Sequence, residues 1–125
     1  MSARIRTIKP EFWGSGDTAK LSRDARLCVL GLISMADDDG RFLASPNAVI
    51  GYVFPNDSNV TPALVRKWLA EASQDGEPVH LYEIGGVAYG CLPTWHRHQR
   101  INRYTASKLP APDLECVPRA TSKDQ

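Results

Sequence analysis

The sequence lacks the features that mark secreted, membrane-spanning and zinc-binding proteins. No apolar run follows the basic residues at the N-terminus, and no stretch is long and apolar enough to cross a bilayer. The cysteines, Cys28, Cys91 and Cys116, are odd in number and form no CxxC pair, which favours a reducing compartment over a disulfide framework. We therefore expect a soluble cytoplasmic protein whose 125 residues build one core.

Acidic residues are also missing from a long stretch near the C-terminus. No Asp or Glu occurs between residues 84 and 112, whereas acids concentrate in the middle of the chain. A second basic group, Arg4, Arg6 and Lys9, precedes the first acid. The net charge of only +1 is not that of a strongly basic domain, so the informative feature is a chain that is basic at both ends and acidic between.

Patterns for catalysis and cofactor binding are absent as well. The sequence contains no nucleophile elbow, no Gly-rich phosphate loop and no convincing pair of carboxylates; residues 37–39 are better interpreted as a helix stop. His96 and His98 stand two residues apart on a predicted loop, without a Cys or an acid at ligand spacing. We therefore expect that the protein is not an enzyme and that it binds neither a metal ion nor a cofactor.

Three stretches have the apolar spacing and end signals of helices. The first extends from residues 21–24 to residue 36 and ends at an Asp-Asp-Asp-Gly turn, the second occupies residues 46–54, and the third occupies residues 62 to about 75. Each begins after a residue suited to the N-cap: Ser22, Ser45 and Thr61. The first is apolar on nearly every side, which predicts the central buried helix.

Strand signals complete the order of elements. Residues 41–43 predict a small strand between the first two helices, and residues 79–84 and 87–92 flank a Gly-Gly turn and predict a hairpin. The sequence therefore predicts an α+β winged helix-turn-helix, with three helices and a small β-hairpin as the wing. Residues 1–16 form an N-terminal arm, 17–94 the winged helix-turn-helix, 95–112 a basic extension and 113–125 a flexible polar tail.

The third predicted helix offers one candidate DNA-binding surface. Its core stripe leaves Arg66 and Lys67 outside, near the front of the helix, where a recognition helix contacts bases or phosphates. Arg66 is the first choice for reading a guanine edge. The alternative is that both residues belong to an ordinary solvated helix face.

The basic extension offers a second candidate surface. Its cations alternate with Trp95 and Tyr104, a pattern suited to a nucleic-acid backbone, although the aromatics equally suit packing against the helices. The predicted DNA-binding residues outside the third helix are Arg97, Arg100, Arg103 and Lys108 in the extension and Arg4, Arg6 and Lys9 in the arm. We expect these cations and those of the third helix to gather on a common side of the fold.

Several stretches, in order, carry a family likeness: the opening ARIRTIKPEFW from Ala3, LSRDARL from Leu21, ADDDGR from Ala36, Phe54-Pro55, HQRINR from His98 and SKLP from Ser107. Over residues 3–112 the chain resembles the N-terminal domain of phage replisome-organiser proteins. The resemblance implies a winged helix that binds origin DNA in the bacterial cytoplasm, within the nucleoid. The chain is then either a free-standing DNA-binding domain or the front of a longer protein that recruits the helicase loader.

The expected partner is therefore DNA, double-stranded in the first instance, and a homodimer would suit a symmetric site. The main alternative is a protein-interaction module, in which the same fold binds a host or phage replication or transcription protein. Fold alone does not choose between these two functions. No membrane partner is expected.

Overall fold

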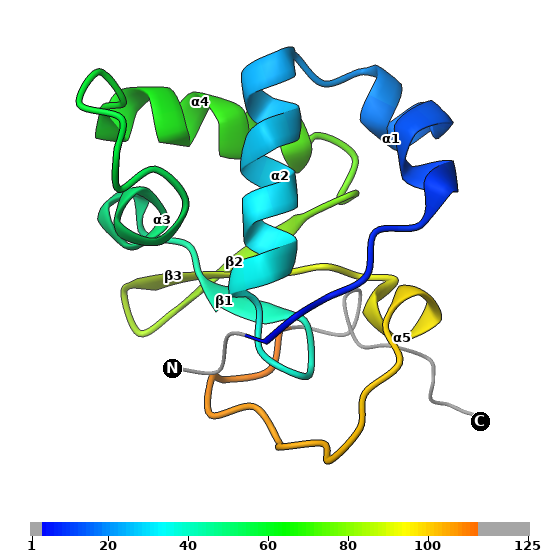
Figure 1. Cartoon of the computed structure of the whole chain (residues 1–125). Helices are drawn as coiled ribbons and strands as arrows, with labels where there is room; N and C mark the ends of the chain where they lie inside the picture. Colours follow the sequence, from blue (N-terminus) through cyan, green and yellow to red (C-terminus); the bar gives the residue numbers. More distant parts are fainter. Residues whose placement is uncertain (1–3, 113–125) are drawn as a thin grey trace.

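The computed structural model describes residues 4–112 as an α+β structure with a three-stranded antiparallel sheet (Figure 1). Its elements, in chain order, are η1 (Pro10–Gly14), α1 (Gly16–Ala19), α2 (Arg23–Met35), β1 (Arg41–Leu43), α3 (Pro46–Val53), α4 (Pro62–Ala72), β2 (His80–Ile84), β3 (Val87–Cys91) and α5 (Trp95–His98). No described helix is long and apolar enough to cross a membrane. The order of α2 to β3 is compatible with a small winged helix.

Each of the three longer helices begins where the sequence predicts. The side chains of Ser22, Ser45 and Thr61 accept hydrogen bonds from backbone N–H groups in the first turns of α2, α3 and α4. Pro46 and Pro62 occupy first-turn positions of α3 and α4, where a missing N–H costs nothing. The predictions of these three helices are confirmed.

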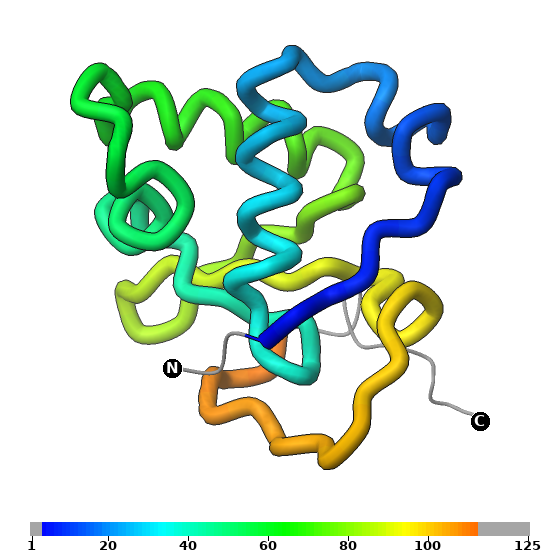
Figure 2. Tube along the Cα trace, in the orientation of Figure 1, coloured from blue at the N-terminus to red at the C-terminus, as the bar shows by residue number. Residues whose placement is uncertain are grey.

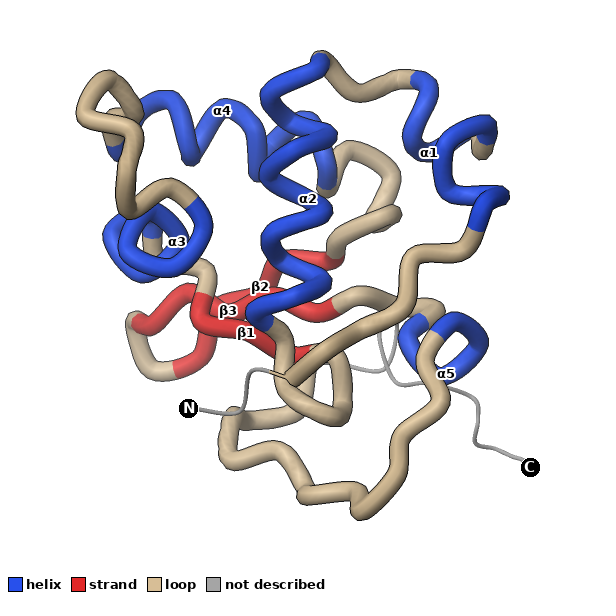
Figure 3. Tube along the Cα trace, viewed as in Figure 1, coloured by secondary structure: helices blue, strands red, loops and turns tan. Residues whose placement is uncertain are grey.

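The sheet has the strand order β1-β3-β2, so the predicted small strand joins the hairpin as its third member (Figure 3). Gly85 and Gly86 form the hairpin turn with φ of 60° and 80°, in the left-handed region that favours glycine. Phe42 points to one face of the sheet and is buried, whereas its neighbours Arg41 and Leu43 point to the other face.

The core lies between the sheet and the helices, with α2 at its centre. Helix α2 packs against α3 and α4, and these three helices cover the face of the sheet that carries Phe42 (Figure 1). Buried side chains of α2 and α4 meet there: Ala25, Cys28, Val29, Leu32, Val65, Trp68, Leu69 and Ala72. Helix α2 is central, but the expectation of burial on nearly every side is wrong: its fully buried residues form one stripe, Ala25, Cys28, Val29 and Leu32, and Leu27 and Ser34 are exposed.

Several local features depart from the sequence prediction. A short helix, η1, interrupts the arm, a second, α1, follows it, and α5 places His96 and His98 on a helical turn instead of a loop. Of the two aromatics of the arm, Phe12 packs against the core and Trp13 is exposed. Cys91 is disulfide-bonded, which contradicts the expectation of three thiols and removes its support for a reducing compartment.

The N-terminal arm and the basic extension run beside one another although about 90 residues separate them in sequence (Figure 2). Beyond Gln99 the extension passes to the face of the sheet opposite the helices. There Arg41 donates to the carbonyl of Leu109, and the hydroxyl of Tyr82 donates to the carbonyl of Pro110. The predicted polar tail, 113–125, lies outside the described residues.

Candidate nucleic-acid interface

Helix α4 exposes a face that carries positive charge and no acid. Arg66 and Lys67 are exposed in the middle of the helix, and the small side chains of Ala63 and Ala70 are exposed one turn before and after them. The one acid of the helix, Glu71, is turned away, because its carboxylate accepts hydrogen bonds from the backbone N–H and the hydroxyl of Ser22. Short neighbours leave the two long cations free to reach a ligand that approaches closely.

The β2–β3 hairpin, the predicted wing, carries no Lys or Arg. Its tip is formed by the paired residues Ile84 and Val87, both partly exposed, on either side of Gly85 and Gly86. Glu83 is the nearest charged residue of the hairpin. Strong phosphate contacts from this hairpin are therefore not supported.

The acidic turn after α2, residues 37–40, is stabilised by hydrogen bonds from its own backbone. The Oδ1 atom of Asp37 accepts hydrogen bonds from the backbone N–H of Asp39 and of Arg41, each at 3.0 Å. Gly40 in the same turn has φ of 77°, which suits glycine. The interpretation of these acids as a helix stop is confirmed, but it is only part of their role.

Asp38 is the point at which the arm is attached. Its carboxylate is 2.8 Å from Nη1 of Arg4 and 3.0 Å from Nη2 of Arg6, and the side chains of Asp38 and Arg6 are only 2% and 4% exposed. The guanidinium of Arg6 also lies 4.9 Å from the centre of the Trp95 ring, whose Nε1 donates to the carbonyl of Asp38. A buried cation thus sits between a carboxylate and an aromatic face.

The same acidic turn also holds the extension. The backbone N–H of Thr105 donates to Asp38, and that of Ser107 donates to Asp39, both at 2.9 Å. The hydroxyl of Tyr104 donates to Asp39 at 2.7 Å, and the hydroxyl of Ser107 donates to Asp37. Residues 104–107 are therefore fixed in place by side chains that lie nearly 70 positions earlier in the chain.

Direct bonds between arm and extension complete this arrangement. The hydroxyl of Thr7 donates to the carbonyl of His98, and the side-chain amide of Gln99 donates to the carbonyl of Thr7. Lys9 donates to the carbonyl of Arg97 at 2.9 Å. Two of these contacts use backbone carbonyls of the extension and one uses the side chain of Gln99, so the side chain of Arg97 stays exposed.

Arg4 fixes an unusual backbone conformation in the extension. It donates to the carbonyls of Asn102 and Arg103, and Arg103 has φ of 57°, the only positive φ of a non-glycine residue in the described part of the chain. Such a conformation costs about 1–2 kcal/mol for an L-residue and persists where its surroundings determine it. The loop that carries Arg100 and Arg103 is thus held in one shape.

The pKa values of three groups reflect these contacts. Burial alone would raise the pKa of Asp38, but the N–H of Thr105 and the guanidinium groups of Arg6 and Arg4 outweigh it, so the pKa lies below its ordinary value. Burial and the hydrogen bond to Asp39 raise the pKa of Tyr104 to about 12. Burial and the nearby positive charges of Lys9 and Arg97 lower the pKa of His98, which favours the neutral imidazole.

The structure separates the predicted DNA-binding residues into two kinds. Arg4, Arg6 and Lys9 of the arm donate to Asp38 or to backbone carbonyls, so their charged groups are engaged within the fold. The remaining predicted residues are exposed and form no ion pair within residues 4–112: Arg66, Lys67, Arg97, Arg100, Arg103 and Lys108.

These exposed cations do not share one surface. In Figure 1, α4 lies at the top of the molecule, and the extension after α5 runs along the bottom, beyond the sheet. The expectation that the cations of the third helix, the arm and the extension gather on a common side is therefore wrong. The sequence analysis does not predict the pairing of Arg6 with Asp38. The only sign of it in the sequence is that both ends of the chain are basic and the middle is acidic.

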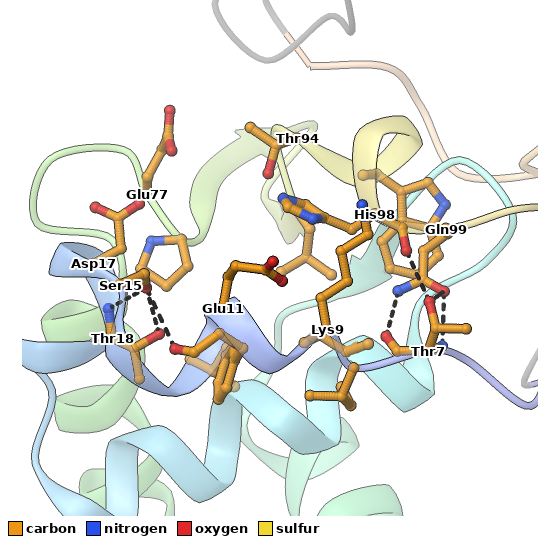
Figure 4. A pocket seen from close by; sticks show the side chains of 17 residues that line it. Thr7, Lys9, Glu11, Ser15, Asp17, Thr18, Glu77, Thr94, His98 and Gln99 are labelled. Atoms are coloured by element: carbon orange, nitrogen blue, oxygen red, sulfur yellow. Dashed lines mark hydrogen bonds between the residues drawn. The ribbon is translucent and has the colours of Figure 1, made fainter.

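One pocket of about 180 Å³ opens between the arm, α1 and α5 (Figure 4). Its apolar wall includes Phe12, Val29, Ile33, Leu92 and Trp95, and its polar rim includes Lys9, Glu11, Asp17, Glu77 and His98. Ligand and cofactor pockets usually enclose about 300–1,000 Å³, so this one suits a single side chain. Among residues 4–112, no three potential metal ligands are grouped together.

Comparisons with family models, with curated proteins and with solved structures found no match for this chain.

Proposed function

We propose that the chain is a DNA-binding domain of the winged-helix type, and that α4 enters the major groove of duplex DNA. In this arrangement α3 braces α4 across the polar turn of residues 55–60, as the first helix of a helix-turn-helix does. Arg66 contacts a base edge or a phosphate, and Lys67 contacts a phosphate.

The observation that carries the proposal is the outward face of α4. It combines two exposed cations, flanking alanines and no free acid, since Glu71 is bonded to Ser22. A helix that lies in a groove about 12 Å wide needs short side chains between its long contacting ones. The resemblance to phage replisome organisers supports origin recognition at the start of replication as the setting.

A titration of fluorescent duplex DNA, followed by anisotropy at about 50 and 200 mM salt, tests this function. Wild type is expected to bind more weakly at the higher salt, because bound cations displace counterions from phosphates. An Arg66→Ala, Lys67→Ala variant should lose affinity and any preference among sequences. No detectable binding by wild type at the lower salt would overturn the proposal.

A charge-matched control comes from the start of α2. Lys20→Ala with Arg23→Ala removes the same two charges from a stretch of the sequence that also contains Asp17 and Asp24. Lys20 already pairs with Asp75 at 3.1 Å. This control should bind DNA much as wild type does. Equal losses in the control and in the α4 variant would mean that net charge, and not the α4 face, governs binding.

The pocket between arm and α5 favours a second function, in which the domain docks a partner protein. Its apolar wall and its size suit one anchoring side chain of the kind that dominates protein interfaces. Ile8 also lines this pocket, so an Ile8→Glu variant places a charge at its apolar wall. Loss of a stoichiometric partner that wild type retains from nuclease-treated host lysate would favour this function, and failure to retain any partner would count against it.

A further inference from the structure

The two groups of exposed cations lie at opposite ends of the molecule. Helix α4 contacts α2 and α3 on one face of the sheet, whereas residues 109 and 110 are bonded to Arg41 and Tyr82 on the other face. Figures 1 and 2 show the sheet and the lower part of α2 between them. A contact made by α4 therefore leaves the extension free.

The extension presents its charges on a fixed backbone. Its carbonyls at residues 97, 102 and 103 accept hydrogen bonds from Lys9 and Arg4, and its N–H groups at residues 105 and 107 donate to the acidic turn. None of these bonds uses the side chain of Arg97, Arg100 or Arg103. A surface that is ordered before binding loses less entropy when a ligand arrives.

Nearby acids do not neutralise these side chains. Asp38 is buried and paired with Arg4 and Arg6, and Asp39 accepts from Tyr104 and from the N–H of Ser107. No acid occurs within residues 84–112. The extension thus carries four exposed cations that form no ion pair among residues 4–112: Arg97, Arg100, Arg103 and Lys108, called the basic strip below.

We propose that this strip binds the sugar-phosphate backbone of a second DNA duplex, so that one molecule bridges two duplexes. The inference rests on the proposed function, because α4 holds the first duplex. A duplex is stiff over about 150 base pairs, so a short one that lies along α4 does not also reach the far side of the sheet. Contacts to phosphates alone make the second site independent of sequence.

The charge count sets the expected salt dependence. Four neutralised phosphates give a slope of about −3.6 in log affinity against log salt, since each contributes about −0.9. Between about 50 and 200 mM salt, the affinity for the second duplex should therefore fall by roughly 100-fold. The α4 site, with two cations, should lose roughly 10-fold over the same range.

A two-colour experiment with the full chain tests the bridge. One 30-base-pair duplex is attached to beads, a second carries a fluorophore, and protein-dependent retention of the second is measured at about 50 mM salt. Arg97→Ala, Arg100→Ala, Arg103→Ala should abolish retention and still bind a single duplex in solution. These substitutions keep every backbone group that the arm and the acidic turn bind, and circular dichroism should confirm an unchanged fold.

The other outcomes are equally decisive. Retention by the triple variant would mean that copies of the protein join two duplexes by pairing with one another, and the proposal would be wrong. Binding of one duplex by wild type without retention of a second would overturn the bridge and leave the proposed function standing. Absence of any DNA binding would overturn both.

Discussion

Replacing Asp38 by Ala tests whether the buried ion pair organises the arm and the extension. The substitution leaves the guanidinium of Arg6, only 4% exposed, without its carboxylate partner. Breaking a buried pair by removing one partner costs about 3–5 kcal/mol, whereas an exposed pair contributes about 0–1 kcal/mol. Asp38→Ala should thus cost about 3–5 kcal/mol, and Arg4→Ala, at a side chain that is 38% exposed, about 1 kcal/mol.

Urea unfolding followed by circular dichroism measures both free energies of unfolding. A loss of this size lowers the unfolding midpoint by about 1–5 M, because small domains lose roughly 1–3 kcal/mol of stability per molar urea. Hydrogen exchange supplies a local readout, since the amide of Thr105 donates to Asp38 and should lose protection. A cost below about 1 kcal/mol for Asp38→Ala would refute the reasoning.

A double variant distinguishes the cost of leaving Arg6 without its partner from the cost of losing the other contacts of the Asp38 carboxylate. Arg6→Met with Asp38→Ala removes both charges and keeps an apolar chain beside Trp95, so it should be more stable than Asp38→Ala alone by about 1–3 kcal/mol. A double variant no more stable than the single one would argue against an uncompensated charge.

The lowered pKa of Asp38 predicts how stability depends on pH. Because the pKa is lower in the folded chain, the unfolded chain takes up the proton first. The stabilisation by the Asp38 carboxylate is therefore complete above about pH 5 and is lost on acidification.

Two further predictions concern the same turn. Gly40 and Gly76 both have φ of 77°, but a Cβ on Gly40 would lie 2.6 Å from the Trp95 ring, whereas one on Gly76 meets nothing within 4 Å. Gly40→Ala should therefore cost about 1–3 kcal/mol more than Gly76→Ala in urea unfolding, and equal costs would contradict the close packing. In a spectrophotometric titration, Tyr104 should ionise near pH 12, and Asp39→Asn should lower its pKa, because a carboxylate then no longer accepts from the phenol. Since its pKa is raised in the folded chain, Tyr104 stabilises the fold up to about pH 10 and loses this effect above it.

The pattern of residues predicts the exposure of some candidate DNA-binding cations but not of others. The spacing of apolar residues on α4 is sufficient to predict that Arg66 and Lys67 point outward, because a helix repeats every 3.6 residues. No spacing rule predicts that Arg6 is buried and Arg97 exposed. Both lie in acid-free basic segments, and they differ only in what folds opposite them.

The sequence by itself determined the local elements of this protein: the helix starts at Ser22, Ser45 and Thr61, and the turn at Gly85 and Gly86. Those signals act between residues that are at most a few positions apart, so they are present before the chain is compact. The tertiary structure alone decided which cations are engaged and on which side the others lie. An ion pair depends on distance in space, and the acidic turn meets its partners across more than 30 residues on one side and more than 60 on the other.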